Sequence, residues 1–309
     1  MRTIKILAIS CFLLCGPIVL AQKSIKEYVT KNSSKKIQKK IMLDILSQPT
    51  SSKANSDGHG KGPYWTSKDQ FPKTIALITY NISDYGYYES NKQWITYGSL
   101  TPNGGNLVAT KMLDQTIVKL KETFNAYGAK LLTPDEFLDT PEKKAYYLTD
   151  FTPTVSKTGK FLSNIENRTT DIVASADGYR YFDMGAAFDF RRAESLGGDL
   201  AKKLGVDAVL SIGITIQTIK NYATIRAVKV AMHGPNPVPR QNKKYVNPKL
   251  GTGYYEGQIY TGATLMFKKP IPCMVMSKNE ITEMNFDGLE VILEHFLHKF
   301  YGSFNWVVR

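Results

Sequence analysis

The segment 201–216 constrains the fold of this chain more than any other. A helical pattern ends at Gly205, and residues 206–216 (VDAVLSIGITI) then give the strongest strand signal in the sequence. A second buried strand is predicted at 73–80, where apolar and β-branched residues again dominate. Strands of this kind need helices to cover them, so the chain is expected to fold as a sheet with packed helices.

The other elements follow from periodicity and capping residues. A helix is predicted to begin at Asn106, to present Leu113, Ile117, Leu120 and Phe124 to the core, and to end at Tyr127-Gly128. Thr133-Pro134-Asp135-Glu136 marks another helix start. The remaining predicted elements are a strand at 129–132, a helix at 192–204, strands at 222–232, 254–267 and 271–276, and a helix at 287–301, with Leu289, Ile292, Phe296 and Phe300 inward.

This order predicts the fold class. It reads strand, helix, strand, helix, an insertion, then helix and strand, followed by antiparallel strands and a terminal helix. We therefore expect an α/β fold: a mixed sheet flanked by helices, with an antiparallel C-terminal meander and an insertion at about 149–192. Residues 64–309, which follow a segment with the composition of a linker, are expected to form a single domain. No internal repeat is recognisable in the sequence.

Residues 1–21 have the pattern of a signal peptide. Arg2 and Lys5 precede an apolar run at 6–20, and Val19-Leu20-Ala21 is a cleavage signal of the small-x-small type. We expect export to the periplasm or beyond the cell, with a mature chain that begins at Gln22. A lipid anchor is the alternative, but Cys15 follows the bulky Leu14, and Cys11 leaves too short an apolar run.

Residues 22–48 are predicted to form a basic amphipathic helical segment. Lysines dominate it, and Ile37, Ile41, Met42, Ile45 and Leu46 recur at helical spacing. Two interpretations stay open: a helix packed on the main domain with solvated lysines, or a helix lying on a membrane surface. Residues 49–63, rich in Ser, Gly and Pro and without a large apolar residue, have the composition of a linker.

Charge and cysteine content limit the partner classes. The formal net charge of +13 suits nucleic acid, anionic lipid or acidic glycans, but export argues against nucleic acid. The favoured interpretation at this point is a basic protein whose charge serves no dedicated partner. Only Cys273 remains after the signal, so no disulfide can form within the mature chain. Cys273 lies in an apolar run, which is typical of a buried cysteine rather than a nucleophile.

No group of residues predicts a catalytic or metal site, and we expect no cofactor. His295 and His298, beside Glu294, have a spacing that could share a metal, yet the default is a helix face with partly exposed histidines. Ser211 lies in a strand without a nucleophile-elbow motif. The other candidates are the backbone amides of Asn103-Gly104-Gly105 for an anion, the acids Asp183 and Asp189, and His59 in the linker.

The most suggestive surface feature is the aromatic loop at 83–105. Tyr and Trp are enriched at protein interfaces and in sugar-binding grooves. We therefore predict a ligand- or partner-binding role for this loop, with packing on its own domain as the alternative. The predicted residues are Tyr85, Tyr87, Tyr88, Trp94 and Tyr97.

Three short stretches resemble the CsgG-like and TolB N-terminal-like exported α/β domains of bacterial envelope proteins. These are Ile75–Ile78 before a long loop and helix, AKLLTPDEFL at 129–138, and AKKLGVDAVLSIG at 201–213. The resemblance covers about 140 residues discontinuously. It implies a non-enzymatic, oligomer-forming envelope component, although the lipid-bearing Cys and the membrane hairpins of a pore are not recognisable in this sequence.

The sequence thus predicts an exported, non-catalytic envelope protein that binds or assembles with a protein or a surface polymer. The alternative is a hydrolase or transferase acting on an envelope glycan or peptide, with polar residues of 149–192 and the aromatic loop at its site. A homo-oligomer and a peripheral membrane contact through residues 23–48 are further possibilities.

Overall fold

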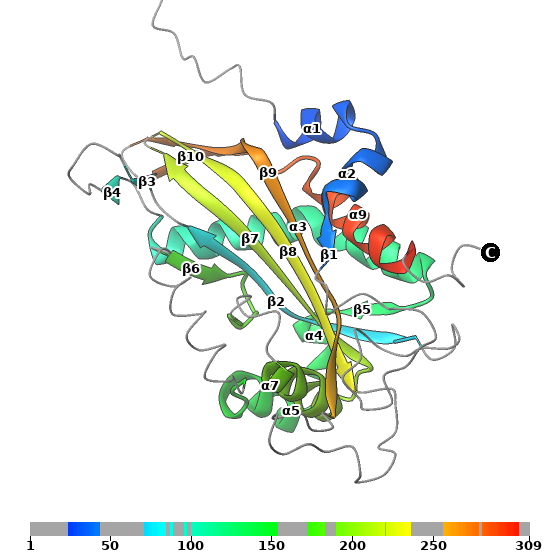
Figure 1. Cartoon of the computed structure of the whole chain (residues 1–309). Helices are drawn as coiled ribbons and strands as arrows, with labels where there is room; N and C mark the ends of the chain where they lie inside the picture. Colours follow the sequence, from blue (N-terminus) through cyan, green and yellow to red (C-terminus); the bar gives the residue numbers. More distant parts are fainter. Residues whose placement is uncertain are drawn as a thin grey trace, which may run out of the picture.

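The computed structural model describes ten parts of the chain (Figure 1). They are residues 24–43, 71–84, 87–88, 96–97, 100–153, 172–182, 190–219, 221–235, 256–277 and 280–302. The predicted signal peptide and linker, together with His59, Tyr85, Trp94, Asp183 and Asp189, lie outside these parts.

The described chain is built around one twisted mixed sheet, which confirms the predicted fold class. Its main path is β1-β9-β8-β7-β2-β5; β6 also pairs with β2, and β10 with β9. β2 is parallel to β5 and β7, whereas β7, β8 and β9 form the expected antiparallel meander. The strands are β1 (Met42–Leu43), β2 (Thr74–Asp84), β5 (Lys130–Leu132), β6 (Ile172–Ser175), β7 (Ala208–Ile219), β8 (Tyr222–Pro235), β9 (Gly257–Ser277) and β10 (Glu280–Met284).

Helices lie on both faces of this sheet. α3 and α9 pack beside each other on one face, and shorter helical segments cover one end of the other face (Figure 1). The helical segments are α1 (Ile25–Lys31), α2 (Ser34–Lys40), α3 (Pro102–Ala126), α4 (Pro134–Phe137), α5 (Pro141–Ala145), the π-helical η4 (Tyr146–Asp150), α7 (Phe190–Ala193), the π-helical η5 (Glu194–Leu200), α8 (Ala201–Leu204) and α9 (Leu289–Gly302).

The larger hydrophobic core lies between the sheet and the α3–α9 layer. Paired residues such as Ile212 and Val230 point to this face and are buried. The predicted inward residues of α9, namely Leu289, Ile292, Phe296 and Phe300, are all buried in it. A smaller core, which includes Leu196, Leu200, Phe137 and Tyr147, lies on the opposite face.

The parallel pair β2–β7 is fixed at its start by one carboxylate. Asp207 Oδ2 accepts hydrogen bonds from Lys73 N and Thr74 N, both at 2.8 Å, and from Thr74 Oγ1 at 3.0 Å. Three bonds to one ionised oxygen are stronger than neutral bonds and hold the two strands in register. This is the strand pair that the sequence signals most clearly.

Helix α3 begins earlier than predicted. Thr101, not Asn106, is the N-cap: its Oγ1 accepts a hydrogen bond from Gly104 N at 3.1 Å, and Pro102 occupies the first helical position. Two glycines in the first turn hide this start from a propensity argument. The predicted end is confirmed, because Tyr127 caps the helix and Gly128 has a φ of 80°.

The N-terminal segment is not one helix. Asn32 and Ser33 separate α1 from α2, and the chain then becomes extended, so that Met42 and Leu43 pair with Thr264 and Ala263 of β9. Extended pairing replaces the helix predicted to continue from Ile41, and Ile45 and Leu46 lie outside the described residues. Ile25, Ile37 and Ile41 are buried in the main core.

The C-terminal strands also differ from the prediction. Residues 257–277 form one long strand, β9, where two strands were expected, and β10 was not predicted. A bulge joins the two halves: Met266 pairs with Ala227, and Ile271 pairs with Ile225. Within 149–192, β6 pairs antiparallel with the second half of β2, so part of the predicted insertion extends the main sheet.

Candidate binding surface

The aromatic loop is described only in part. Tyr87 and Tyr88 form β3 (Tyr87–Tyr88), and Tyr97 lies in β4 (Thr96–Tyr97). The two strands pair as a hairpin, with Tyr87 opposite Tyr97. Because Tyr85 and Trp94 lie outside the described residues, the binding role of these five aromatic residues stays a prediction.

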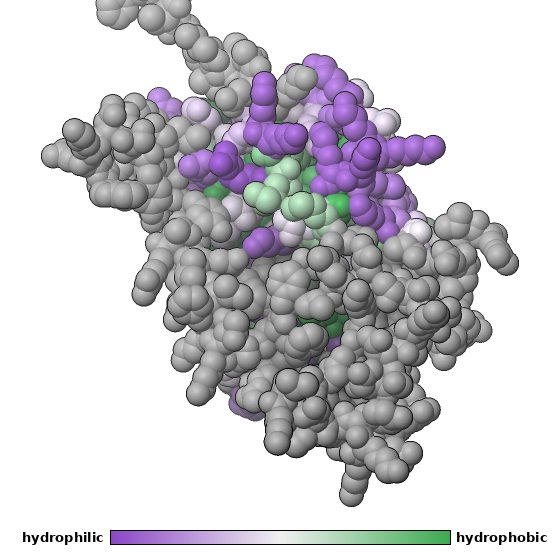
Figure 2. Space-filling view, in the orientation of Figure 1, coloured by the Kyte–Doolittle hydropathy of each residue, from purple (hydrophilic) through white to green (hydrophobic). Residues whose placement is uncertain are grey.

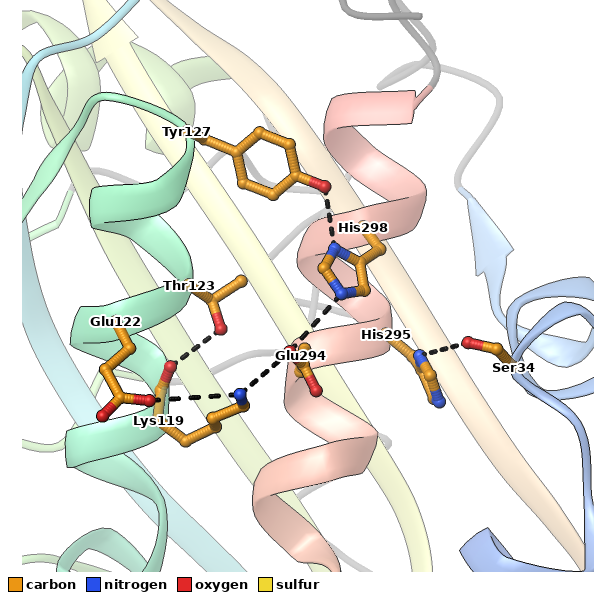
Figure 3. A network of polar contacts seen from close by, with 8 residues as sticks. All are labelled: Ser34, Lys119, Glu122, Thr123, Tyr127, Glu294, His295 and His298. Carbon is orange, nitrogen blue, oxygen red and sulfur yellow. Dashed lines mark hydrogen bonds and ion pairs between the residues drawn. The ribbon is translucent and has the colours of Figure 1, made fainter.

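The two histidines of α9 serve different contacts (Figure 3). His298 points toward α3, where its Nδ1 lies 2.7 Å from the hydroxyl of Tyr127. His295 points toward α2, and its Nδ1 lies 3.3 Å from Ser34 Oγ. Burial lowers the pKa of His295, and the neighbouring His298 lowers it further. His295 is buried, not partly exposed as predicted, because α2 covers it.

The same network joins α3 to α9 through charges (Figure 3). Glu294 Oε1 lies 3.2 Å from Lys119 Nζ and 3.5 Å from His298 Nε2. Burial raises the pKa of the Tyr127 hydroxyl, and the Glu294 carboxylate raises it further, so this group remains a neutral hydrogen-bonding partner. The network therefore connects α3 to α9 through side chains that are partly exposed.

Several other polar candidates are buried inside elements. Ser211 Oγ is buried in β7 and, within the described part of the chain, has no hydrogen-bond partner. Cys273 is buried in β9, its thiol directed at Ala223 O, and burial raises the pKa of that thiol. Burial, with Arg192 nearby, lowers the pKa of His233 to about 3, so its imidazole is neutral. The amides of Gly104 and Gly105 bond to Thr101.

Charge is distributed unevenly over the described elements. β7, β8 and β9 contain no acidic residue, and their four charged side chains, all basic, are Arg226, Lys229, Lys268 and Lys269. Residues 24–43 add six lysines against a single acid, Glu27, which pairs with Lys31. These elements therefore carry an excess of basic charge, which attracts anions through its summed field.

We define the basic surface as the exposed cationic residues of α1, α2 and the β8–β9 bulge, apart from Lys31, which pairs with Glu27. Its members are Lys26, Lys35, Lys36, Lys39, Lys40, Arg226, Lys268 and Lys269. Lys40 contacts Tyr28, lying 3.3 Å from its hydroxyl and 5.0 Å from its ring centre. Within the described chain, none of the eight forms an ion pair, so their charge is available to an external anion.

The helices that carry these lysines are firmly attached. Ile37 and Ile41 are at most 1% exposed. From α9, Lys299 Nζ donates hydrogen bonds to the carbonyls of Gln38 at 2.8 Å and Ile41 at 2.5 Å. These bonds satisfy carbonyl groups at the end of α2 that would otherwise lack partners.

Aromatic packing connects the helices to the strand bulge. Tyr28 of α1 meets Phe267 edge-on, with ring centres 5.2 Å apart. Phe267 begins the stretch of β9 that bulges between the Met266 and Ile271 pairings, and Arg226 bulges on the β8 side. Bulges re-aim side chains, and Arg226, Lys268 and Lys269 are all exposed here.

Comparisons with family models, curated proteins and solved structures give no match. The resemblance to CsgG-like and TolB N-terminal-like domains therefore stays a prediction. None of the described helices has the length and apolar character needed to cross a membrane.

Sequence reasoning identified only part of the basic surface. The lysines of 23–40 were recognised, but Arg226, Lys268 and Lys269 were not, because their exposure depends on a bulge that joins distant strands. One signal was readable in advance: the predicted strands at 206–216, 222–232, 254–267 and 271–276 contain a single acid outside position 207, namely Glu256. Glu256 pairs with Lys202.

Proposed function

We propose that this chain is an exported, non-catalytic component of the cell envelope that binds an anionic partner on the basic surface. The partner is an acidic segment of a protein or an acidic surface polymer. The observation that carries this proposal is the set of unpaired, exposed lysines on α2, a helix held in place by buried isoleucines and by Lys299.

The firm attachment of α2 favours a binding role for its lysines over a role in solubility alone. A lysine on a disordered tail must be ordered when it binds, whereas the backbone of α2 is already ordered by its contacts with α9. Lys35, Lys36 and Lys39 are exposed and lie within a single turn and a half of this helix. Their charges add up over a short distance, which steers an anionic partner toward them.

The use of polar side chains elsewhere supports a binding role. Glu294, His298 and Tyr127 are engaged with each other between α3 and α9, and the thiol of Cys273 is buried. These groups stabilise packing in the described chain. The alternative of a hydrolase or transferase depends on residues 149–192 and the aromatic loop, much of which lies outside the described residues, and it stays a prediction.

The test is binding to a fluorescent poly-glutamate peptide, followed by anisotropy at two salt concentrations. We expect binding that weakens between about 50 and about 300 mM salt, because exposed charges are screened. Changing Lys35, Lys36 and Lys39 together to Gln is expected to weaken binding about five- to tenfold, since each exposed ionic contact contributes roughly 0.2–1 kcal/mol.

A matched variant controls for net charge. Lys111→Gln, Lys130→Gln and Lys144→Gln remove the same charge from exposed positions on α3, β5 and α5, and this triple variant should bind nearly as tightly as the wild type. Equal losses in the two variants would mean that only overall charge matters. Absence of any binding to the peptide would refute the proposal.

A further inference from the structure

Two exposed methionines lie beside the basic surface. Met42 of β1 is 55% exposed and Met266 of β9 is 63% exposed. Met42 pairs with Thr264, and Met266 is two residues further along the same strand, so both side chains are on the same face of the sheet. They are therefore neighbours, not isolated apolar residues.

The methionines project above small neighbours. Met266 pairs with Ala227, while Thr264 pairs with both Met42 and Lys229. Ala227 and Thr264 are shorter than Met and leave Met42 and Met266 exposed, whereas Lys229, which pairs with Thr264, adds a longer basic side chain to the same face. Met is flexible and adapts to irregular apolar partners.

Cationic residues surround these methionines. Lys39 and Lys40 precede Met42 in the chain, and Lys268 and Lys269 follow Met266. β1 and β9, which carry the two methionines, lie beside α2 (Figure 1). In the same orientation, Figure 2 shows a small hydrophobic patch with hydrophilic residues above it and on both sides.

We propose that this patch is a contact site for the surface of an anionic lipid bilayer. The proposal goes beyond the proposed function and rests on it: the basic surface that binds an acidic segment or polymer would also bind anionic lipid headgroups. Lysines attract anionic headgroups, and long basic side chains keep their charge at that level while their stems lie against apolar groups. Met42 and Met266 would then reach the boundary between headgroups and acyl chains.

The two exposed methionines favour contact with a bilayer over contact with a soluble polymer. An acidic peptide or glycan satisfies the lysines but offers little apolar surface to two protruding thioethers. An anionic bilayer offers charged headgroups to the lysines and apolar acyl chains below them to the methionines. Charge complementarity alone fits both partners, so the experiment must separate the apolar contribution from the ionic one.

The experiment is co-sedimentation of the purified protein with vesicles of phosphatidylcholine alone and of phosphatidylcholine with about 30% phosphatidylglycerol. We expect binding to the anionic vesicles only, weaker at high salt. Met42→Ser with Met266→Ser should reduce vesicle affinity at least about fivefold while leaving poly-glutamate binding and the salt slope unchanged.

The control is Val118→Ser, which removes an equally exposed apolar residue, 64% exposed, from α3. It should bind anionic vesicles as the wild type does. Thermal melting checks that each variant is folded. The vesicle binding of the wild type tests the proposal even if a variant fails to fold. The bilayer proposal fails if the wild type binds poly-glutamate but not vesicles, or if the methionine variant binds vesicles normally. Loss of both ligands in the wild type would instead defeat the proposed function.

Discussion

At the scale of single residues, four glycines determine how close a helical segment comes to the sheet. A Cβ added at Gly197 of η5 would lie 2.3 Å from the carbonyl oxygen of Gly234 in β8. A Cβ at Gly257 of β9 would lie 2.3 Å from Ala193 O, and one at Gly198 would meet Gly257 N at 3.1 Å. η5 therefore lies backbone to backbone against the ends of β8 and β9, and neither side has room for a side chain.

The first prediction follows from this contact. Gly197→Ala should destabilise the protein by about 1–3 kcal/mol or more, because backbone atoms cannot move aside as a flexible side chain could. Gly302→Ala is the control, since a Cβ there has no atom within 4 Å. The measurement is urea unfolding of the two variants. Equal stability of both would show that η5 can shift away from β8 at little cost.

The burial of a side chain was predictable only where the pattern of its own helix or strand determines it. Cys273 and the inward residues of α9 were predicted from their own neighbours in the sequence, and they are buried. Gly197 and Gly234 gave no such signal, because they come into contact only when the 36 residues between them have folded. The burial of His295 likewise depends on α2, from the far end of the chain.

At the scale of elements, capping explains several boundaries. Thr133-Pro134-Asp135-Glu136 was predicted as a helix start, and α4 begins there with a capping box. Glu136 accepts hydrogen bonds from Thr133 N at 2.9 Å and from Lys121 Nζ at 2.7 Å. Partial burial alone would raise the pKa of Glu136, but these hydrogen bonds outweigh it and lower the pKa to about 2.

The second prediction is a pH dependence of this cap. A carboxyl whose pKa is lowered by folding stabilises the protein above its ordinary pKa, and that stabilisation is lost as pH falls toward the folded pKa. Glu136→Gln should cost about 0.5–2 kcal/mol at pH 7, and its difference from the wild type should shrink between pH 4.5 and about 2.

Denaturant unfolding at several pH values measures the effect of Glu136→Gln. Glu122→Gln is the control, because Glu122 is 64% exposed and lies 3.9 Å from Lys119, so that its removal should change stability little at any pH. A gap between the wild type and Glu136→Gln that stays constant down to pH 2 would contradict the proposed ionic cap.

The third prediction concerns the attachment of α2. Lys299→Met keeps the apolar stem but removes both hydrogen bonds to the carbonyls of Gln38 and Ile41. Amides of residues 34–41 should exchange at least about fivefold faster, because each such bond contributes about 0.5–1.5 kcal/mol or more. Lys111→Met, on the exposed side of α3, should leave exchange in this segment unchanged. Unchanged protection of α2 in the Lys299 variant would mean that the isoleucines alone hold it.

Element type was predictable where a segment is long and periodic, as in α3, β7 and α9. The N-terminal segment was predicted less well, because its lysines and isoleucines fit a helix that could continue past Ile41. Pairing with β9 competes with that helix and prevails at Met42. The prediction for β9 failed for a similar reason. Residues 267–270 include two lysines and Pro270, a composition typical of a loop between two strands. In the structure they form a bulge within one strand.

At the scale of the whole molecule, the order of elements was sufficient to predict a mixed sheet with an antiparallel C-terminal half. It was not sufficient for the basic surface, which combines the N-terminal helices with a bulge more than 180 residues later in the chain. The sequence shows how many lysines there are, but not which of them lie close together in the fold. The apolar patch was hidden for a further reason: Met42 was expected on a helix, where it would have shared no face with Met266.

The last prediction tests whether residues 24–43 belong to the fold or only to the binding surface. A chain that starts at Tyr64 lacks Ile25, Ile37 and Ile41, whose burial is worth at most roughly 1.5–3 kcal/mol each. It should melt about 10 °C or more below the chain that starts at Gln22. The Lys35, Lys36 and Lys39 triple variant should bind poly-glutamate about five- to tenfold more weakly but keep its melting temperature, because those side chains are exposed. If the truncated chain melts normally and only its salt-sensitive binding is lost, α1 and α2 act as a surface anchor and contribute little to the fold.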